Sequence, residues 1–128
     1  MSKFLPALAA LSLTALTAPA AFAEGDPAKG EIVFKRCAAC HVVEEGVNRI
    51  GPSLHGVFGR TSGSVEGFRY SNAMASADIV WTEETIKEYL QNPRTYVPGN
   101  RMAFPGLRNE QQLDDLIAYL KQATGAES

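Results

Sequence analysis

Apolar residues recur with helical spacing most clearly near the end of the chain. Four of them form an i, i+3, i+4, i+7 stripe, which is typical of a helix with one buried face: Leu113, Leu116, Ile117 and Leu120. Asn109 precedes the stripe as an N-cap, and Gln112 makes a capping-box-like pair with it. The pattern predicts a helix that starts after Asn109 and ends before Gly125.

A second helix is predicted from residue 27 to about residue 38. Asp26 is a good N-cap, and Pro27 suits the first helical position. The apolar positions of this helix are Ile32, Val33 and Phe34. Gly30 lies on the face of Phe34 and costs a helix about 1 kcal/mol relative to alanine, so we expect it to let the C-terminal helix cross closely. The alternative is a glycine that the helix merely tolerates.

The middle of the chain divides into an irregular stretch and a short helix. Residues 42–80 show no sustained period and are interrupted repeatedly by glycine. So long an irregular segment is unusual in a compact domain, and a cofactor enclosed by the loops would explain it. A helix from about residue 83 to residue 92 follows, with Thr82 as its cap and Pro93 at its end. Its apolar stripe is Ile86, Tyr89 and Leu90. Three helices without strand pairs indicate an all-α fold.

The beginning of the chain predicts a secretory signal peptide over residues 1–23, followed by one domain over residues 24–128. Lys3 supplies the positive charge, the apolar segment follows it, and Ala21-Phe22-Ala23 is a small-x-small cleavage site. An uncleaved membrane anchor is the alternative. The apolar run is interrupted by Pro6 and is short for a membrane span of about 20 residues, so we expect an exported, soluble protein.

The charge balance excludes one class of partner. Without the leader, eleven lysines and arginines face fourteen aspartates and glutamates, which gives a net charge of −3. Nucleic-acid binding requires a strongly basic surface, so we expect no nucleic acid partner. The balance says little about protein partners, because a contact patch can be locally basic on an acidic protein.

The chain has two cysteines, and both fall in the sequence Cys37-Ala38-Ala39-Cys40-His41. The spacing C-x-x-C-H is typical of c-type haem attachment, in which each thiol adds to one vinyl group of a porphyrin and the histidine binds the iron. A disulfide, a thioredoxin-like redox pair and a zinc site that adds His55 are the alternatives. The disulfide would constrain little of the unfolded chain, the redox pair lacks a βαβ context, and the zinc site lacks a second ligand pair.

A haem used for electron transfer needs a sixth ligand, and a methionine thioether suits that use. Met102 is held on a loop by the proline and glycine residues on both sides of it. Met74, in a short predicted helical turn, and His55 are the other candidates. Arg60 is either solvated or a hydrogen-bond donor to a haem propionate. The residues alone favour Met102 and leave Arg60 undecided.

Taken together, these motifs resemble class I cytochrome c, in its mitochondrial and bacterial cytochrome c2 branch. The resemblance covers the chain from Gly25 to about Thr124 and rests on Gly30 with Phe34, Cys37–His41, Gly51–Arg60, Gly67–Tyr70, Trp81, Tyr89–Pro93, Tyr96–Phe104 and Leu116–Leu120. It implies the cytochrome c fold, in which the N- and C-terminal helices cross and short helices and loops enclose one covalent haem c.

The resemblance also implies how the cofactor is attached and ligated. Cys37 and Cys40 are expected to form thioethers with the haem. His41 and Met102 are expected to be the axial ligands of the iron. The carbonyl of Pro52 is expected to receive the Nδ1–H of His41, which orients the imidazole ring.

Further roles in the haem pocket follow from the same resemblance. Arg60, Tyr70 and Trp81 are expected to hydrogen-bond the inner propionate. Tyr89 is expected to bond near the Met102 sulfur, and Phe104 to cover the exposed edge of the haem. No residue is expected to be catalytic.

The function that the resemblance implies is one-electron transfer by a soluble, monomeric carrier. Its transient partners would be a bc-type complex and either a terminal oxidase of a respiratory chain or a photosynthetic reaction centre. It would meet the membrane only through these complexes. The signal peptide indicates a bacterial periplasm, and the chain keeps just four lysines after the leader, fewer than many relatives carry. The rivals are a haem peroxidase or gas-binding protein with an open distal site, and a zinc-stabilised interaction module.

Overall fold

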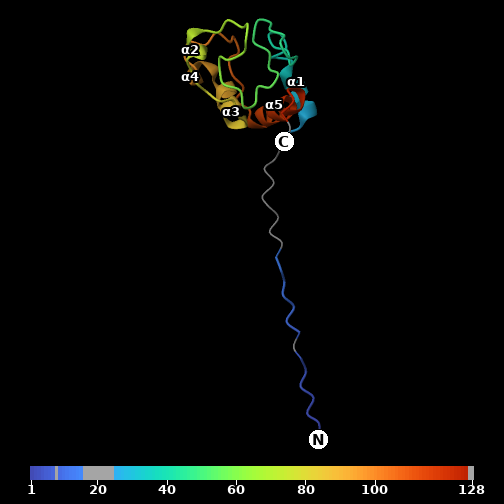
Figure 1. Cartoon of the computed structure of the whole chain (residues 1–128). Coiled ribbons are helices and arrows are strands. Elements are labelled where there is room, and N and C mark those ends of the chain that lie inside the picture. Colours follow the sequence, from blue (N-terminus) through green and yellow to red (C-terminus); the bar gives the residue numbers. More distant parts are fainter. Residues whose placement is uncertain (8, 16–24, 127–128) are drawn as a thin grey trace.

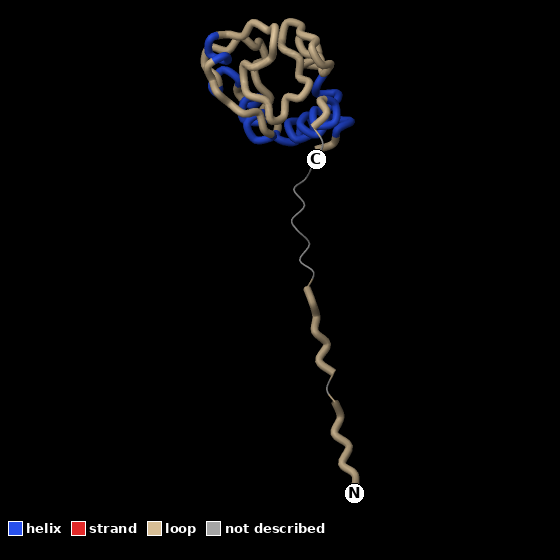
Figure 2. The backbone as a smooth tube through the Cα atoms, in the orientation of Figure 1, coloured by secondary structure: helices blue, strands red, loops and turns tan. Residues whose placement is uncertain are grey.

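The computed structural model describes residues 1–7, 9–15 and 25–126. Its helices are α1 (Pro27–Phe34), α2 (Asn72–Ala75), α3 (Glu83–Gln91), α4 (Pro93–Tyr96) and α5 (Glu110–Ala123). The described residues contain no strand, and one isolated antiparallel bridge joins Thr61 to Val80. Figure 2 shows the helices along the left, lower and right margins of the fold and long loops over its upper part and its middle. The expected all-α class is confirmed.

The helices α1 and α5 pack directly against each other, although they lie near opposite ends of the sequence (Figure 1). Gly30 sits at the crossing: a Cβ there would lie 1.9 Å from the carbonyl oxygen of Asp115 and 2.7 Å from the Cβ of Tyr119. Beside it, the rings of Phe34 and Tyr119 pack with their centroids 5.1 Å apart. The prediction that Gly30 permits a close crossing is confirmed.

The predicted N-caps are present, and the largest boundary error lies at the end of α1. Asp26 accepts a hydrogen bond from the backbone N–H of Ala28 at 2.9 Å, and Asn109 accepts one from Gln112 at 3.0 Å. The helix α1 ends at Phe34, earlier than the predicted residue 38. The backbone beyond it continues as hydrogen-bonded turns, because the Phe34 carbonyl accepts the N–H groups of both Cys37 and Ala38.

Pro93 does more than end α3, which was its predicted role. The helix α3 ends at Gln91, and Pro93 then occupies the first position of α4. Asn92 caps this helix by accepting the backbone N–H of Thr95 at 3.3 Å. Proline is favoured at a first helical position because its missing N–H would be unpaired there anyway. A helix of four residues is too short to produce a periodic signal, so the sequence did not indicate α4.

The predicted stripe of α5 forms the centre of the core. Leu113 is 0% exposed and Leu116 is 1% exposed, and they pack with Phe34, Leu107 and Leu120. A second cluster, on the side of α3, is built from Val57, Trp81, Ile86, Tyr89, Val97 and Ile117. Ile32, expected to be apolar core, is instead 64% exposed. It lies two positions from Gly30, and since successive helical residues turn by about 100° it faces away from α5.

The irregular segment is closed by a short antiparallel contact that the sequence did not indicate. The N–H of Gly59 donates to the Trp81 carbonyl at 2.6 Å, and the N–H of Trp81 donates to the Arg60 carbonyl at 2.9 Å. The N–H of Ser62 likewise donates to the Ile79 carbonyl at 2.6 Å. These bonds hold Arg60 next to Trp81. They also hold together the two ends of the loop formed by residues 63–78.

The predicted leader falls partly outside the described residues. Residues 1–7 and 9–15 contain no helix and are exposed. The predicted cleavage site, Ala21-Phe22-Ala23, lies in residues 16–24, outside the described part. Within that part no helix has the length and apolar character that crossing a membrane requires. The boundary between leader and domain therefore stays a prediction.

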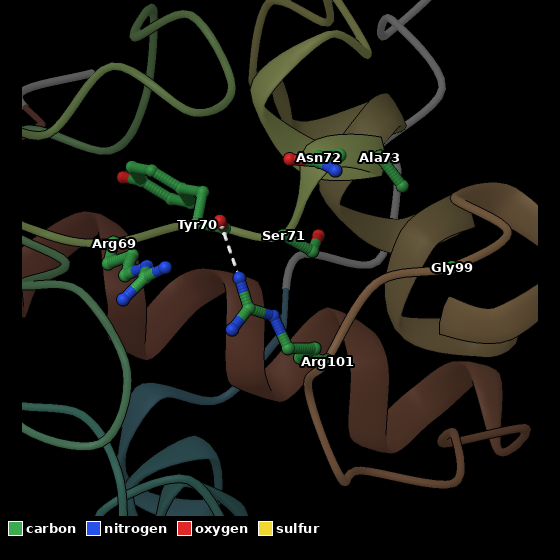
Figure 3. A pocket seen from close by; sticks show the side chains of 7 residues that line it. All are labelled: Arg69, Tyr70, Ser71, Asn72, Ala73, Gly99 and Arg101. Carbon is green, nitrogen blue, oxygen red and sulfur yellow. Dashed lines mark hydrogen bonds between the residues drawn. The ribbon is translucent and has the colours of Figure 1, made fainter.

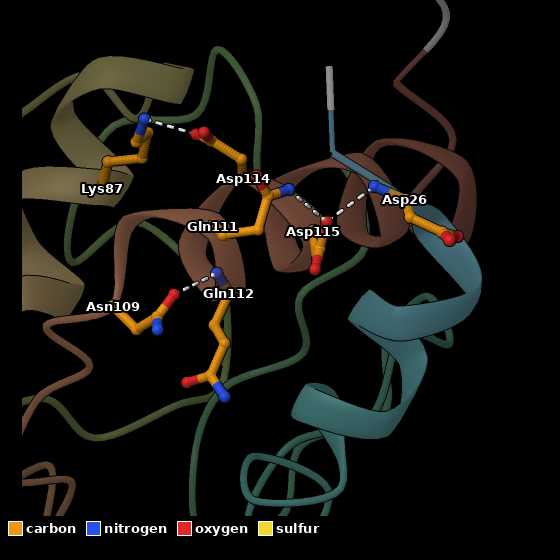
Figure 4. Close-up of polar contacts among 7 residues, drawn as sticks. All are labelled: Asp26, Lys87, Asn109, Gln111, Gln112, Asp114 and Asp115. Carbon is orange, nitrogen blue, oxygen red and sulfur yellow. Dashed lines mark hydrogen bonds and ion pairs between the residues drawn. The ribbon is translucent and has the colours of Figure 1, made fainter. Parts of the chain in front are cut away.

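Asp115 is a buried carboxylate that fastens the start of the domain to α5 (Figure 4). Asp115 is 4% exposed. Its Oδ1 accepts a hydrogen bond from the N–H of Asp26 at 2.7 Å and another from the Nε2–H of Gln111 at 3.0 Å. The hydrogen bond from Asp26 is the main reason why the pKa of Asp115 is lowered, against the opposing effect of burial. The charged form is therefore favoured in the folded state.

Asp115 should accordingly make the protein sensitive to acid. The unfolded carboxyl, with a pKa of about 3.9, binds a proton more readily than the folded one, so the free energy of unfolding falls as pH drops through this region. Asp115→Asn keeps an acceptor oxygen but removes the titrating carboxyl group. The free energy of unfolding, measured by urea unfolding at a series of pH values, should then fall less steeply as the pH decreases. Glu31→Gln, an exposed carboxylate of α1, controls for net charge. Equal slopes for the two variants would contradict the expectation.

Candidate functional site

The two thiols and the histidine lie on hydrogen-bonded turns directly after α1. The N–H of Cys40 and the N–H of His41 both donate to the Cys37 carbonyl, at 3.0 and 2.9 Å. Both cysteines are half-buried free thiols, so the alternative of a disulfide is not realised. Burial is the main reason why the pKa of the Cys37 thiol is raised. The arrangement presents two thiols and one imidazole from five consecutive residues.

His41 is prepared to act as a metal ligand through one ring nitrogen. Its Nδ1 lies 2.8 Å from the carbonyl oxygen of Pro52. A carbonyl only accepts, so Nδ1 carries the proton and the lone pair of Nε2 is left for a metal. The pKa of His41 is lowered mainly by burial, and the positive charge of Arg60 lowers it further. The hydrogen bond to Pro52 acts in the opposite direction and raises it. The ring is therefore favoured in its neutral, metal-binding form.

Gly51 shapes the space around this imidazole. A Cβ on Gly51 would lie 2.4 Å from Cε1 of His41 and 2.7 Å from its Nδ1. The N–H of Gly51 donates to the Cys40 carbonyl at 2.9 Å, which ties the loop to the cysteine turn. Only glycine permits the backbone to approach the ring so closely.

The zinc alternative needs His55 near the cysteines, and the structure does not bring it into such a cluster. His55 Nε2 instead lies 3.9 Å from the Glu45 carboxylate. Across residues 1–7, 9–15 and 25–126 no three histidine, cysteine, aspartate or glutamate side chains are grouped as a metal site would require.

Met102 lies on the loop between α4 and α5, packed against the cluster that contains Trp81 and Tyr89. The Tyr89 hydroxyl is 3.8 Å from the Met102 sulfur, as the expected role of Tyr89 requires. Burial raises the pKa of Tyr89 to about 12, so this hydroxyl is a donor at neutral pH. The ring of Tyr89 also packs on that of Trp81, with centroids 5.1 Å apart. Trp81 itself is 7% exposed.

Arg60 is partly buried and has one unsatisfied donor. One guanidinium N–H group, Nη1, donates to the carbonyls of Ser53 at 2.9 Å and His55 at 3.0 Å. The Nε–H is buried and has no acceptor in the described structure. Burial lowers the pKa of Arg60, and the nearby Tyr70 opposes this shift. The Tyr70 oxygen accepts the N–H of Val65 at 3.1 Å, and its own O–H remains free to donate.

The loop that carries Met102 is fastened to the segment before α2. Arg101 donates through Nη2 to the Tyr70 carbonyl at 2.6 Å, across a surface pocket that Figure 3 shows. Arg69, Ser71, Asn72, Ala73 and Gly99 line the rest of this pocket. This contact joins segments 31 residues apart in the sequence, and it holds the two loops of the site in a fixed relation.

Phe104 and the cysteine turn are linked through Arg36. The guanidinium carbon of Arg36 lies 5.9 Å from the centroid of the Phe104 ring, a cation–π distance. Phe104 also packs beside the cluster that contains Leu113 and, at its margin, Cys37. The predicted residues Cys37 and Phe104 are thus brought to one region of the molecule.

A family model described as cytochrome c matches residues 27–124 of this chain. The chain belongs to the cytochrome c family. Cytochrome c2 of Blastochloris viridis is 50% identical over 111 residues, 86% of this chain and 86% of the relative. Cytochrome c of Chlamydomonas reinhardtii is 54% identical over 102 residues, 78% of this chain and 91% of the relative. Cytochrome c of Ginkgo biloba is 49% identical over 105 residues, 80% of this chain and 93% of the relative.

Membership confirms the class I cytochrome c resemblance, the fold and the cofactor. Proteins of the cytochrome c family are electron carriers that bind one covalent haem c and exchange electrons with redox partners. This member has the cytochrome c fold and carries one haem c. The alternatives of a zinc-stabilised module and a thioredoxin-like pair are excluded with it.

The side chains of the site fit a haem. The orphaned Nε–H of Arg60 is suited to an anionic oxygen such as that of a propionate, since a buried unpaired donor is costly. The close approach of Gly51 holds the imidazole in place, and the thioether of Met102 is a soft ligand of the kind that electron-transfer haems use. The sequence assigned no role to Gly51 or to Asn100, which contacts both Tyr89 and Met102. The proline and glycine directly before Asn100 were the local signals of a constrained turn.

Proposed function

We propose that this cytochrome is a soluble one-electron carrier of the bacterial periplasm whose haem is ligated by His41 and Met102. It shuttles electrons from a bc-type complex to a terminal oxidase or a photosynthetic reaction centre. The observation that carries the proposal is the Met102 sulfur, held on its loop 3.8 Å from the Tyr89 hydroxyl. A second protein ligand leaves no position for a substrate, which distinguishes a carrier from a peroxidase or a gas-binding protein.

Cys37 and Cys40 hold the cofactor covalently through thioethers. The haem, when bound, supplies an iron that gains and loses one electron. His41 would hold the iron through Nε2, while its Nδ1–H stays on the Pro52 carbonyl. That hydrogen bond fixes the ring orientation and raises the basicity of the ligating nitrogen. Met102 would hold the iron through its sulfur, and a thioether ligand favours a high reduction potential.

The remaining pocket residues neutralise and enclose the cofactor. Arg60, Tyr70 and Trp81 hydrogen-bond the inner propionate, and the unpaired Nε–H of Arg60 supports this role. Phe104 covers the exposed edge, where electrons leave the protein. Arg36 lies over the Phe104 ring and adds a positive charge at that edge.

The location and partners are inferred from charge, leader and kinship. The predicted signal peptide over residues 1–23 supports export, and a bacterial cytochrome c2 is among the relatives. We infer that Arg36, Arg94, Arg101 and Arg108 take the place of the lysines that many relatives carry around the haem edge. We infer a monomer that forms small, transient interfaces and that contacts the membrane only through its partner complexes.

An exported holoprotein should connect a quinol-reducible bc-type complex to a terminal oxidase or reaction centre. The expected result is electron flow that rises with the concentration of the cytochrome and falls with salt, because charged edges guide the encounter. Oxygen consumption, or re-reduction of the photo-oxidised centre, measures it. Rapid binding of carbon monoxide to the wild-type ferrous protein would instead indicate an open iron site and contradict the carrier role.

The variant Cys37→Ala with Cys40→Ala is the matched control for covalent attachment. It keeps His41 and Met102 but has no thiol to form a thioether. Acid–acetone should extract its haem, whereas the wild-type protein should keep a red product whose pyridine haemochrome spectrum is that of a c-type haem. Haem that stays with the double variant would show that attachment lies elsewhere.

A further inference from the structure

The side chain of Asn100 joins α4 to the loop that carries Met102. Its Nδ2 donates to the carbonyl oxygens of Pro93 and Val97, each at 2.8 Å. Its Oδ1 accepts the N–H of Met102 at 3.0 Å and lies 3.4 Å from the Tyr89 hydroxyl. One half-buried amide thus satisfies four polar groups around the sulfur.

The orientation of this amide is determined by its partners. Both hydrogens of Nδ2 point to carbonyl oxygens, which only accept. The reversed orientation would place Oδ1 against these two carbonyls and the amino group against the N–H of Met102, so these three contacts would be repulsive. The oxygen of Asn100 therefore faces Tyr89 and Met102.

Tyr89 consequently has two acceptors for a single proton. The Asn100 oxygen lies 3.4 Å from its hydroxyl, and the Met102 sulfur lies 3.8 Å from it. A thioether is a weak acceptor, whereas an amide oxygen is a good one. The hydroxyl is buried and protonated, so its proton is shared between these two atoms, and the amide competes with the sulfur.

We propose that Asn100 is a positioning residue that sets the reduction potential by drawing the Tyr89 hydroxyl away from the Met102 sulfur. The inference rests on the proposed ligation by Met102. A hydrogen bond donated to a ligand sulfur withdraws electron density from it and so disfavours the more positive ferric iron, which raises the potential. By competing for the proton, Asn100 holds the potential below the value that Tyr89 alone would impose.

Asn100→Ser tests this competition. A serine hydroxyl still accepts the backbone N–H two residues ahead, as Asn100 does for Met102, but the shorter side chain does not reach Tyr89. At a fixed ambient potential, the ratio of reduced to oxidised protein should rise several-fold over that of the wild type, measured by spectroelectrochemical titration of the holoprotein. Asn100→Leu, which also removes the acceptor but is closer in size, should shift the ratio in the same direction.

The Tyr89→Phe background is the matched control. Phenylalanine has no hydroxyl proton that could pass from the Asn100 oxygen to the Met102 sulfur. Asn100→Ser should therefore leave the ratio of reduced to oxidised protein unchanged in the Tyr89→Phe background. An equal shift in both backgrounds, or no shift in either, would overturn the proposal. The upfield-shifted methyl resonance of an iron-bound methionine, followed by NMR in the reduced state, separates the two levels of the argument. If this resonance is absent from the wild type, ligation by Met102 is refuted. If it is present but the effect of Asn100→Ser on the ratio of reduced to oxidised protein does not depend on Tyr89, only the role of Asn100 is refuted.

Discussion

Met102→Ala is expected to lower the reduction potential of the holoprotein by on the order of a few tenths of a volt, since axial ligands set haem potentials over a range of about 0.8 V. The thioether favours the ferrous iron, and alanine has no atom that replaces it. Water or an added ligand should then bind the iron, so carbon monoxide should bind the reduced variant rapidly. Potentiometric titration and visible spectra measure both effects.

Met74→Ala provides the matched control for this experiment. Met74 is the other methionine beyond the predicted leader, and it lies in α2, half-buried against the cluster around Trp81. Removing its side chain should cost some stability through a small cavity but leave the potential and the carbon monoxide reaction unchanged. If Met74→Ala or His55→Ala abolished the sulfur signature or the high potential while Met102→Ala did not, the ligand assignment would be wrong.

Gly30→Ala is expected to destabilise the protein by about 1–3 kcal/mol, the usual cost of overpacking a core. The added methyl would lie 1.9 Å from the Asp115 carbonyl oxygen, which belongs to helix backbone and cannot move aside by a rotamer change. Helix propensity alone predicts the opposite sign, a gain of about 1 kcal/mol. Urea unfolding followed by far-ultraviolet circular dichroism therefore decides between packing and propensity by the sign of the change.

Ala28→Gly is the reverse exchange at an exposed position of the same helix. It should cost less than the interior propensity difference of about 1 kcal/mol, because Ala28 lies in the first turn of α1, and Gly30→Leu should cost more than Gly30→Ala. A stabilised Gly30→Ala protein would mean that the crossing of α1 and α5 is looser than the structure describes.

The sequence predicted the parts of the fold that depend on periodicity and on local capping. The stripe of α5 and the crossing at Gly30 were both anticipated, because a buried face leaves a repeating pattern in a long helix. The four-residue helix α4 left no such pattern, and the end of α1 blurs into turns that share the Phe34 carbonyl. Ile32 misled because an apolar residue on a short helix does not reveal which face is covered.

The site divides in the same way. Cys37, Cys40 and His41 are contiguous, so their chemistry can be recognised without a structure. The bond between His41 and Pro52 and the contact between Tyr89 and Met102 each join different loops, and only the family resemblance anticipated them. Asn100 had no signal of its own, because an asparagine after a glycine usually marks an ordinary turn. Its importance comes from the four partners that folding brings to it.

The packing of α1 against α5 also has a temporal consequence. The chain is synthesised from its N-terminus, so the thiols of Cys37 and Cys40 emerge about 70 residues before α5 begins at Glu110. At roughly 5–20 residues per second, that delay amounts to several seconds. During this interval α1 cannot yet pack against α5, and the two thiols lie in a chain that has not finished folding.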